Sequence, residues 1–225
     1  MQTQAIINSE YTSSETEPII LNLSLGYRIA KRTIDIIGSF LLLIILSPLF
    51  LIIAIIIKIE NPSADIFYKQ LRSGKNGVPF NFYKFRTMIP NADEVKENLM
   101  DLNEMDGPVF KIKNDPRVTR FGRFLRKSSI DELPQLLMVL RGKMSLVGPR
   151  PLPVAEAEAC NSFQKQRELV KPGITCIWQI SGRNDVSFMR WVEMDLEYIS
   201  KQSLWVDIAI LLKTLPAVLF TTGAS

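Results

Sequence analysis

The longest uninterrupted apolar segment of the chain runs from Ile36 to Ile57 and contains no charged residue. Roughly 18 to 20 apolar residues suffice to insert into a bilayer as a helix. Ser47-Pro48 lies near the middle, where proline cannot donate its backbone hydrogen bond and clashes with the preceding turn. At about 1.5 Å per residue each half reaches about halfway through a core of ~30 Å, so a hairpin that enters and leaves by one face is geometrically available.

The charges on either side of this segment do not choose between a hairpin and a kinked spanning helix. Arg28, Lys31 and Arg32 precede it, and the cations that follow it are Lys58, Lys69, Arg72 and Lys75. A spanning helix usually has its Lys and Arg residues concentrated on one side. Here neither side is clearly the inner one, and the residues alone leave both topologies open.

Composition changes along the chain predict four parts. Residues 1–26 contain three Glu but no Lys or Arg, which indicates a disordered polar tail. Residues 27–60 form the membrane segment, and residues 61–202 form a globular domain, to which the family resemblance described below gives a cytoplasmic catalytic role. Residues 203–225 are apolar apart from Asp207 and Lys213, as in an amphipathic helix that lies at the membrane surface or docks on the protein core.

The globular part carries one clear strand pattern. Val78 to Met88 alternates, with Phe80, Phe82, Lys84 and Arg86 on one face. Its two cations fit either a solvated strand edge or an anion site. The polar segment from Asn91 begins as a helix, so we expect a helix-rich α+β fold with a small β-sheet.

Basic residues are concentrated in the middle of the chain although the net charge is only +4. The arginines of this region recur every third residue, at Arg117, Arg120, Arg123 and Arg126. In a helix this spacing places them along one side, and the guanidinium fork suits phosphate oxygens. Nucleic acid is a competing partner, but no recognised binding motif accompanies the basic stretch. We therefore expect no nucleic acid.

Two adjacent acids, Asp131 and Glu132, stand inside this basic region. Ser129 and Glu132 fit a capping box at the start of a helix, which leaves Asp131 unexplained. We expect the surrounding cations to lower both carboxylate pKa values and keep both groups ionised. An ionised Asp can attack a phosphoryl centre, and a neighbouring Glu together with substrate phosphates can hold Mg²⁺.

The chain contains no histidine, which excludes Ser-His-Asp and Cys-His nucleophilic sites and HExxH zinc sites. Its two cysteines, Cys160 and Cys176, lack the spacing of a CxxC motif. We interpret them as packed free thiols.

Several motifs together resemble the bacterial sugar transferases, which are polyprenyl-phosphate phosphoglycosyl transferases of the monotopic type. The resemblance covers nearly everything from Lys31 to Leu219. Its motifs are KRTIDI (Lys31–Ile36), the Ser47-Pro48 break, YKFRTM (Tyr83–Met88), DPRVTRFGRFLRKSSIDELPQ (Asp115–Gln135), MSLVGPRP (Met144–Pro151), KPGITCIWQISGRN (Lys171–Asn184) and DLEYISKQSLWVDIAILLKT (Asp195–Thr214).

This resemblance implies a two-step transfer on the cytoplasmic face of the bacterial inner membrane. Asp131 matches the nucleophile that attacks the β-phosphate of a UDP-sugar and releases UMP, and Glu132 matches the Mg²⁺ ligand. Undecaprenyl phosphate then accepts the sugar phosphate from the enzyme, which initiates a lipid-linked polysaccharide. The Ser47-Pro48 break is expected to form a re-entrant membrane hairpin, accompanied by interfacial amphipathic helices.

The family motifs also suggest which residues bind substrate. These are Lys84, Arg86, Arg117, Arg120, Arg126, Arg150 and Arg183. The length of the segment from Asn91 to Asn114 favours a hexose-1-phosphate transferase that uses UDP-glucose or UDP-galactose. Membrane lipid is an expected partner, and a homodimer is allowed. The main alternative is a non-catalytic membrane-anchored scaffold of a polysaccharide assembly complex.

Overall fold

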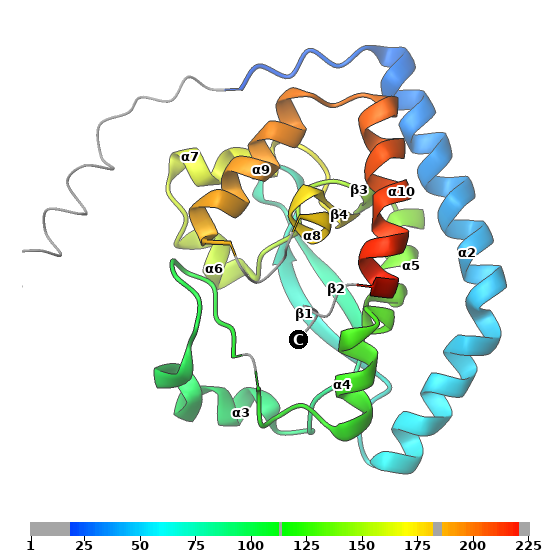
Figure 1. Ribbon diagram of the computed structural model, residues 1–225, viewed down its shortest axis with the longest axis vertical. Helices are drawn as coiled ribbons and strands as arrows, with labels where there is room; N and C mark the ends of the chain where they lie inside the picture. The colour runs from blue at the N-terminus through cyan, green and yellow to red at the C-terminus, as the bar shows by residue number, and fades with distance from the viewer. Residues whose placement is uncertain (1–18, 113, 182–185, 221–225) are drawn as a thin grey trace, which may run out of the picture.

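The computed structural model describes residues 19–112, 114–181 and 186–220, and one long helix, α2 (Leu25–Glu60), bows along one side of it (Figure 1). The other elements lie on the concave side of this helix. In chain order they are β1 (Phe67–Ser73), η1 (Lys75–Gly77), β2 (Pro79–Phe85), α3 (Ala92–Lys96), η2 (Glu97–Leu102), α4 (Arg120–Lys127), η3 (Ile130–Gln135), α5 (Leu136–Leu140), β3 (Ser145–Val147), α6 (Val154–Glu158), α7 (Ser162–Lys165), η4 (Gln166–Leu169), β4 (Gly173–Thr175), α8 (Ile177–Ile180), α9 (Phe188–Ser200) and α10 (Leu204–Phe220).

The predicted break at Ser47-Pro48 is not found, because α2 is one continuous helix that contains Pro48. Proline cannot donate to the carbonyl of Ile44 one turn earlier. The hydroxyl of Ser47 donates to that carbonyl instead, at 2.8 Å. The Ser-Pro pair thus replaces the hydrogen bond that proline removes, and the predicted hairpin with two separate half-helices is not confirmed.

Helix α2 is long and apolar enough to cross a membrane, and most of its apolar surface is not covered by the protein. Its most apolar window of 18 residues has a mean hydropathy of 3.3 and is 11% buried. Phe40, Ile45, Leu51 and Ile59 are all more than half exposed. A contiguous apolar surface of this kind marks a site of contact with a membrane or another protein. The helix is therefore compatible with membrane anchoring.

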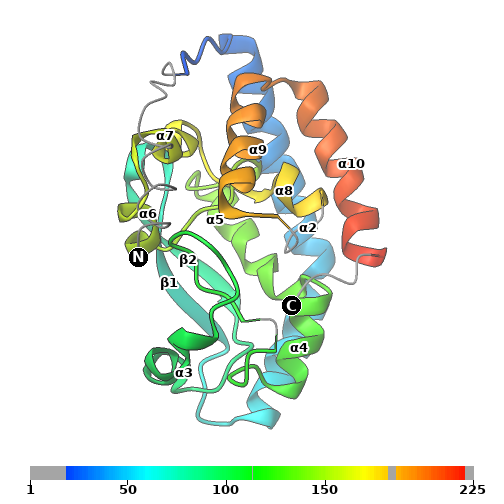
Figure 2. The same ribbon diagram turned by 60° about the vertical axis from the view of Figure 1, so that its left-hand side comes forward.

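Two small sheets confirm the predicted α+β character. Strands β1 and β2 pair antiparallel, with Tyr68 opposite Lys84, and β3 and β4 pair parallel. On β2 the predicted face is correct for Phe80 and Phe82, which are buried, and for Lys84, which is half-buried beyond them. Figure 2 shows the β1–β2 hairpin on one side of the molecule and α2, α9 and α10 gathered on the other.

The C-terminal helix α10 combines the two alternatives left open by its sequence. It packs against α2, α8, β3 and β4, and Asp207 and Ile210 are buried in these contacts. Trp205 and Leu212 point away from the protein and are 81% and 64% exposed. The helix is therefore docked on the core along one face and presents an apolar face outward.

A buried carboxylate joins α2 to the smaller sheet. Asp35 is 4% exposed and accepts hydrogen bonds from the Ser145 hydroxyl at 3.0 Å and from the Leu146 amide at 2.9 Å. Both donors belong to β3, so this single side chain fixes the strand against the helix.

Cys160 and Cys176 are buried free thiols, as predicted.

We expect Asp35→Ala to lower the free energy of unfolding by roughly 3 kcal/mol, because two buried donors lose a charged acceptor. Asp35→Asn keeps one acceptor oxygen and should cost less. Thr33→Ala, at an exposed position two residues away, is the matched control. Denaturant unfolding in detergent measures all three. Equal stabilities for Asp35→Ala and Thr33→Ala would contradict the role given to Asp35.

Candidate functional site

A cavity of about 280 Å³ lies between the β1–β2 hairpin, η3, the segment that follows β3, and helices α8 and α9. Basic side chains dominate its polar wall. The charged residues that line it are Arg72, Lys84, Lys111, Arg126, Asp131, Glu132, Arg150 and Glu156. Five cations face three carboxylates here, so the cavity is suited to an anionic ligand.

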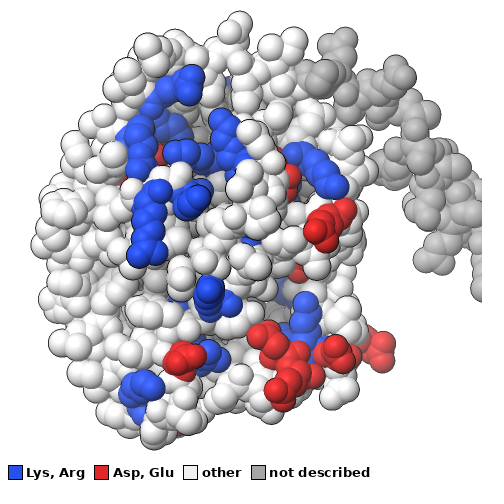
Figure 3. Space-filling view, turned by 180° about the vertical axis from the view of Figure 1, so that it is seen from behind, with Lys and Arg blue, Asp and Glu red and all other residues white. Residues whose placement is uncertain are grey.

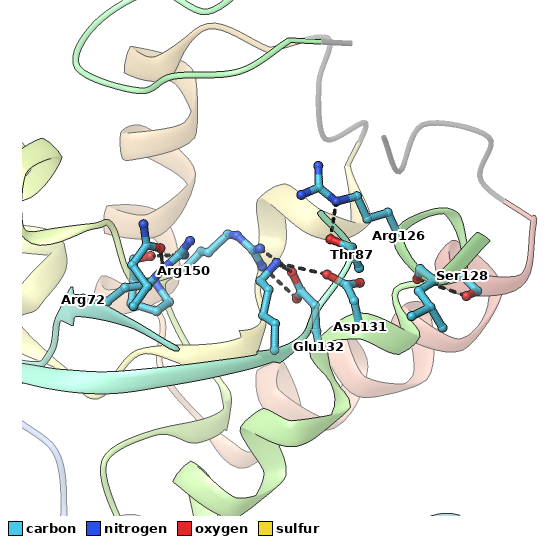
Figure 4. A network of polar contacts seen from close by, with 11 residues as sticks. Arg72, Thr87, Arg126, Ser128, Asp131, Glu132 and Arg150 are labelled. Carbon is cyan, nitrogen blue, oxygen red and sulfur yellow. Dashed lines mark hydrogen bonds and ion pairs between the residues drawn. The ribbon is translucent and has the colours of Figure 1, made fainter. Parts of the chain in front are cut away.

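Glu132 lies between two cations at the centre of this cavity (Figure 4). Lys84 Nζ is 2.7 Å from its Oε1, and Arg150 binds both of its oxygens, with NH1 2.9 Å from Oε2 and NH2 on Oε1. Burial alone would raise the pKa of Glu132. Arg150 and Lys84 outweigh burial and hold this pKa well below its ordinary value. Glu132 is therefore ionised and fully engaged.

Asp131, its neighbour, is in a different environment. It is 4% exposed and has one cationic contact, Lys84 Nζ at 3.3 Å from Oδ2. Burial raises its pKa, the charge of Glu132 adds to the rise, and Lys84 and Arg126 oppose it without cancelling it. The prediction that cations would lower both pKa values is thus correct for Glu132 and wrong for Asp131, because desolvation exceeds the attraction of one shared lysine.

The predicted capping box is also wrong. Ser129 does occupy the N-cap position of η3, but its φ is 56°, in the left-handed region, and its side chain makes no capping hydrogen bond. The Glu132 carboxylate is held by Lys84 and Arg150 rather than by the N-cap amide. This segment is a short 3₁₀ turn whose acids point into the cavity.

Helix α4 brings one of the row of arginines to this cavity. Arg126 lines the wall and donates from Nε to the Thr87 hydroxyl at 2.9 Å. Helix α4 approaches Thr87 closely because Gly122 packs against the backbone of Thr87. A Cβ added to Gly122 would stand 2.1 Å from the Thr87 carbonyl oxygen. Only glycine allows this contact, which sets the depth at which Arg126 enters the site.

Two other arginines predicted to bind substrate, Arg117 and Arg86, do not line this cavity. Arg117 precedes α4 and forms a buried ion pair with Asp115, from NH2 to Oδ2 at 2.6 Å. Arg86 leaves the strand and donates to the Asp65 carbonyl at 2.9 Å. Both line an adjoining cavity of about 230 Å³ that shares Lys84 and Arg126 with the first.

Two of the predicted substrate contacts remain, Arg120 and Arg183. Arg120 is exposed at the start of α4 and lines neither cavity. Arg183 lies outside the residues that the structure describes. The helical spacing was correct from Arg120 onward, but only Arg126 at its end reaches the site.

Sequence reasoning missed Arg72 and the pair Trp178 and Trp191. Arg72 lies over the Phe82 ring at 4.2 Å, donates to the Pro151 carbonyl at 2.7 Å and lines the cavity. Burial, followed by the charge of Arg150, lowers its pKa to about 10. The rings of Trp178 and Trp191 stack with their centroids 4.4 Å apart, and both residues line the cavity. Pairing of β1 with β2 was the signal that would have placed Arg72 opposite Phe80, on the same face of the hairpin as Lys84.

Residues 26–221 match the model of a family described as bacterial sugar transferase. The chain belongs to this family. It is 44% identical over 199 residues to the exopolysaccharide production protein ExoY of Rhizobium meliloti, a match that covers 87% of this chain and 88% of the relative.

Other relatives of the chain have names that state a substrate. A galactosyl transferase, CpsE, of Streptococcus agalactiae is 48% identical over 88% of this chain and 44% of its own length. A UDP-glucose:undecaprenyl-phosphate glucose-1-phosphate transferase of Caulobacter vibrioides is 40% identical over 86% of this chain and 71% of its own length. The chain therefore spans less than half the length of the streptococcal relative.

An apolar cavity of about 320 Å³ opens beside the cavity that holds Asp131 and Glu132. The two cavities share Ser129, Glu132 and Gln179. Its remaining wall is mostly aliphatic. It comes from α2, η3, β4 and α10, through Leu46, Leu49, Ile130, Leu133, Ile174 and Ala217 among others. A polar and an apolar chamber thus meet at Glu132.

A buried ion pair holds the arginine that binds Glu132. Arg167 donates from NH2 to Asp195 at 2.5 Å and to the backbone carbonyl of Arg150 at 3.0 Å. Asp195 is 1% exposed and Arg167 is 4% exposed, and the guanidinium of Arg167 stacks on Trp191 at 4.6 Å. The pair therefore ties α9 to the backbone that carries Arg150.

We expect Arg167→Met to lower the free energy of unfolding by about 3–5 kcal/mol, because it leaves Asp195 buried without a partner. The double variant Arg167→Met/Asp195→Asn removes both charges and should recover more than half of this loss. Arg190→Met, which breaks the exposed pair with Glu193, should cost less than about 1 kcal/mol. Additive effects of the two buried substitutions in denaturant unfolding would refute the coupling.

Proposed function

We propose that this protein transfers a hexose-1-phosphate from a UDP-sugar to undecaprenyl phosphate, through a covalent sugar phosphate on Asp131. The observation that carries the proposal is the buried Asp131 carboxylate in a cation-lined cavity that adjoins an apolar one. Relatives named as undecaprenyl-phosphate galactose and glucose-1-phosphate transferases support the reaction class. The alternative of a non-catalytic scaffold offers no reason for this pair of cavities.

In the first step a carboxylate oxygen of Asp131 attacks the β-phosphorus of the UDP-sugar. A bond from that oxygen to phosphorus forms, the bond from phosphorus to the bridging oxygen breaks, and UMP leaves with the bond's electron pair. Arg72, Arg126, Lys84 and Arg150 line the space that the two phosphates would fill. Fixed cations in a partly buried cavity stabilise the charge that develops on the transferring phosphoryl group.

In the second step a phosphate oxygen of undecaprenyl phosphate attacks the same phosphorus and releases the Asp131 carboxylate. The acceptor has an anionic head on an isoprenoid chain, so it needs a polar and an apolar chamber side by side. The apolar cavity provides the second of these, and its wall includes Leu46 and Leu49 of α2. The lipid would enter between α2 and α10 with its phosphate beside Glu132.

The residues present fit a role for Mg²⁺ in this reaction. Mg²⁺ is usually bound by one or two carboxylates together with substrate phosphates and water. Asp131 and Glu132 offer adjacent carboxylates on the wall of the cavity, and Glu132 would exchange part of its contact with Lys84 or Arg150. When bound, the ion would neutralise charge on the diphosphate. Lys84 would then be free to bind a phosphate oxygen.

The proposed location is the bacterial inner membrane with the cavity on the cytoplasmic face, where nucleotide sugars are made. The exposed apolar face of α2 and the outward apolar residues of α10 would contact lipid. Whether α2 crosses the bilayer or enters and leaves by one face is decided by labelling cysteines placed at Ser24 and Ser63. Labelling of both positions from the same side supports the re-entrant arrangement.

We expect Asp131→Asn to lower turnover by at least about 10⁴-fold, because the amide cannot form the covalent intermediate. Incubation of the wild type with radiolabelled UDP-glucose or UDP-galactose and Mg²⁺, without acceptor, should label the protein and release one equivalent of UMP. The variant should do neither. The control is Asp101→Asn, at an exposed position in η2. Full turnover by Asp131→Asn would rule out the covalent route, and the better of the two sugars identifies the donor.

We expect Ala217→Trp to separate the two half-reactions, because an indole would fill the apolar cavity and leave the polar one open. The burst of UMP without acceptor should persist. Transfer to undecaprenyl phosphate should fall about tenfold or more, because the acceptor loses its binding contacts in the apolar cavity. Leu212→Trp, on the exposed face of the same helix, is the control. A loss of the UMP burst equal to the loss of transfer would argue against the assignment of this cavity.

A further inference from the structure

A further cavity, of about 490 Å³, lies where α2 begins, and neither half-reaction uses it. It is formed by the segment before α2, the first turns of α2, the β1–β2 turn and the segment between η4 and β4. Five cations and one acid line it: Arg28, Lys31, Arg32, Lys75, Lys171 and Asp35. Figure 3 shows Lys and Arg side chains gathered toward this end of the molecule, with acidic side chains at the other end.

Some of these charges are already committed to the fold. Lys31 pairs with Asp207 at 2.8 Å, and Asp35 accepts two hydrogen bonds from β3. Arg32 donates to the carbonyls of Val139 and Leu140 at 2.7 and 2.9 Å, which are neutral acceptors at the end of α5. Its positive charge therefore remains unbalanced by any ion pair among the described residues.

Two of the cations that line this cavity, Arg32 and Lys171, approach each other beside Gly142, which does not itself line it. Arg32 NH2 and Lys171 Nζ lie 3.5 and 3.7 Å from the position that a Cβ on Gly142 would occupy. Within the part of the chain that the structure describes, Lys171 makes no ion pair, and Lys75 at the cavity mouth makes none either. Burial and then the charge of Arg32 lower the pKa of Lys171, and the opposing charge of Asp35 does not cancel them.

Apolar side chains border the same cavity. Leu25 and Ile29, on its α2 wall, are 68% and 58% exposed, and Leu21 and Leu23 are half-buried beside them. From here the exposed apolar face of α2 continues toward Ile59. When that face is immersed in a bilayer, the cations at its first turns lie at the depth of the phosphate groups. A ligand with an anionic head and an acyl chain matches both kinds of wall.

We propose that this cavity binds the phosphate headgroup of an anionic phospholipid, with Arg32, Lys75 and Lys171 around the phosphate and an acyl chain along Leu25 and Ile29. A free phosphate or sugar phosphate would use the cations alone and would leave the exposed leucine and isoleucine uncovered. The site is distinct from the cavity of Asp131, and the proposal stands whether or not the transfer reaction does.

Native mass spectrometry of the full chain in neutral detergent tests this. Phosphatidylglycerol should bind one per protein, and phosphatidylcholine should bind at least about tenfold more weakly, because it carries no net charge. Lys75→Gln/Lys171→Gln should weaken phosphatidylglycerol binding about tenfold or more. The matched control is Lys58→Gln/Lys69→Gln, which removes the same charge at the other end of α2 and in β1 and should bind like the wild type.

Three results would overturn the proposal. Equal binding of the two lipids would exclude an anionic headgroup site, and equal loss in both double variants would reduce the effect to net charge. Displacement of the lipid by glycerol phosphate at matched concentration would show a site for a free anion. The exposed single variant Lys75→Gln serves if the double variant fails to fold. Release of UMP by Lys75→Gln/Lys171→Gln in detergent should equal that of the wild type, which separates this site from the transfer chemistry.

Discussion

The contact between Glu132 and its two cations is the interaction on which the rest of the site depends. Lys84 comes from β2, Glu132 from η3 and Arg150 from the segment after β3, so one carboxylate joins three parts of the chain that are distant in sequence. It also allows cations to gather around a cavity without an anionic ligand. Breaking it would leave unpaired charges in a partly buried place, which is costly. A diphosphate would offer the same cations more negative charge than Glu132 does, so the site can exchange one anion for another.

The support for this contact extends to the long apolar helix α2. Arg167 and Asp195 hold the backbone of Arg150 against α9. The next turn of α9 carries Tyr198, whose hydroxyl contacts the Val147 carbonyl and Asp207. Lys31 of α2 contacts the Val147 carbonyl, Asp207 and the Tyr198 hydroxyl. The polar core of the domain therefore runs from the cavity to the first turns of α2. Such a network keeps the Asp131 carboxylate at a fixed height relative to the apolar surface, which the proposed reaction between a soluble donor and a lipid acceptor would require.

The sequence predicted those features that depend on local pattern. The apolar helix and the alternating face of β2 with Lys84 are where the pattern placed them. The acidic pair does lie among cations, and Arg150, which only the family resemblance suggested, binds Glu132. The prediction failed where a long-range contact overrides a local preference. A capping box was expected at Ser129, but Lys84 and Arg150 bind the Glu132 carboxylate more strongly than a backbone amide would. A break was expected at Pro48, but the Ser47 hydroxyl bonds the carbonyl that proline leaves without a donor. Arg72 was overlooked because its place depends on strand pairing, which a single strand pattern does not reveal.

The environments of the two adjacent acids also explain why they would divide the work of the reaction. Paired carboxylates whose surroundings push their pKa values apart are suited to different roles. Glu132 is saturated by cations, so its oxygens are poor nucleophiles and good partners for positive charge. Asp131 is more deeply buried and has only a shared contact with Lys84, so its ionised form is less stabilised and more reactive. Asp131 lies in a 3₁₀ turn, two residues after Ser129, whose backbone is left-handed. This position directs Asp131 into the polar cavity, while Glu132 borders both cavities. In the proposed reaction the nucleophile would thus face the donor, and the residue that gathers positive charge would stand where donor and acceptor meet.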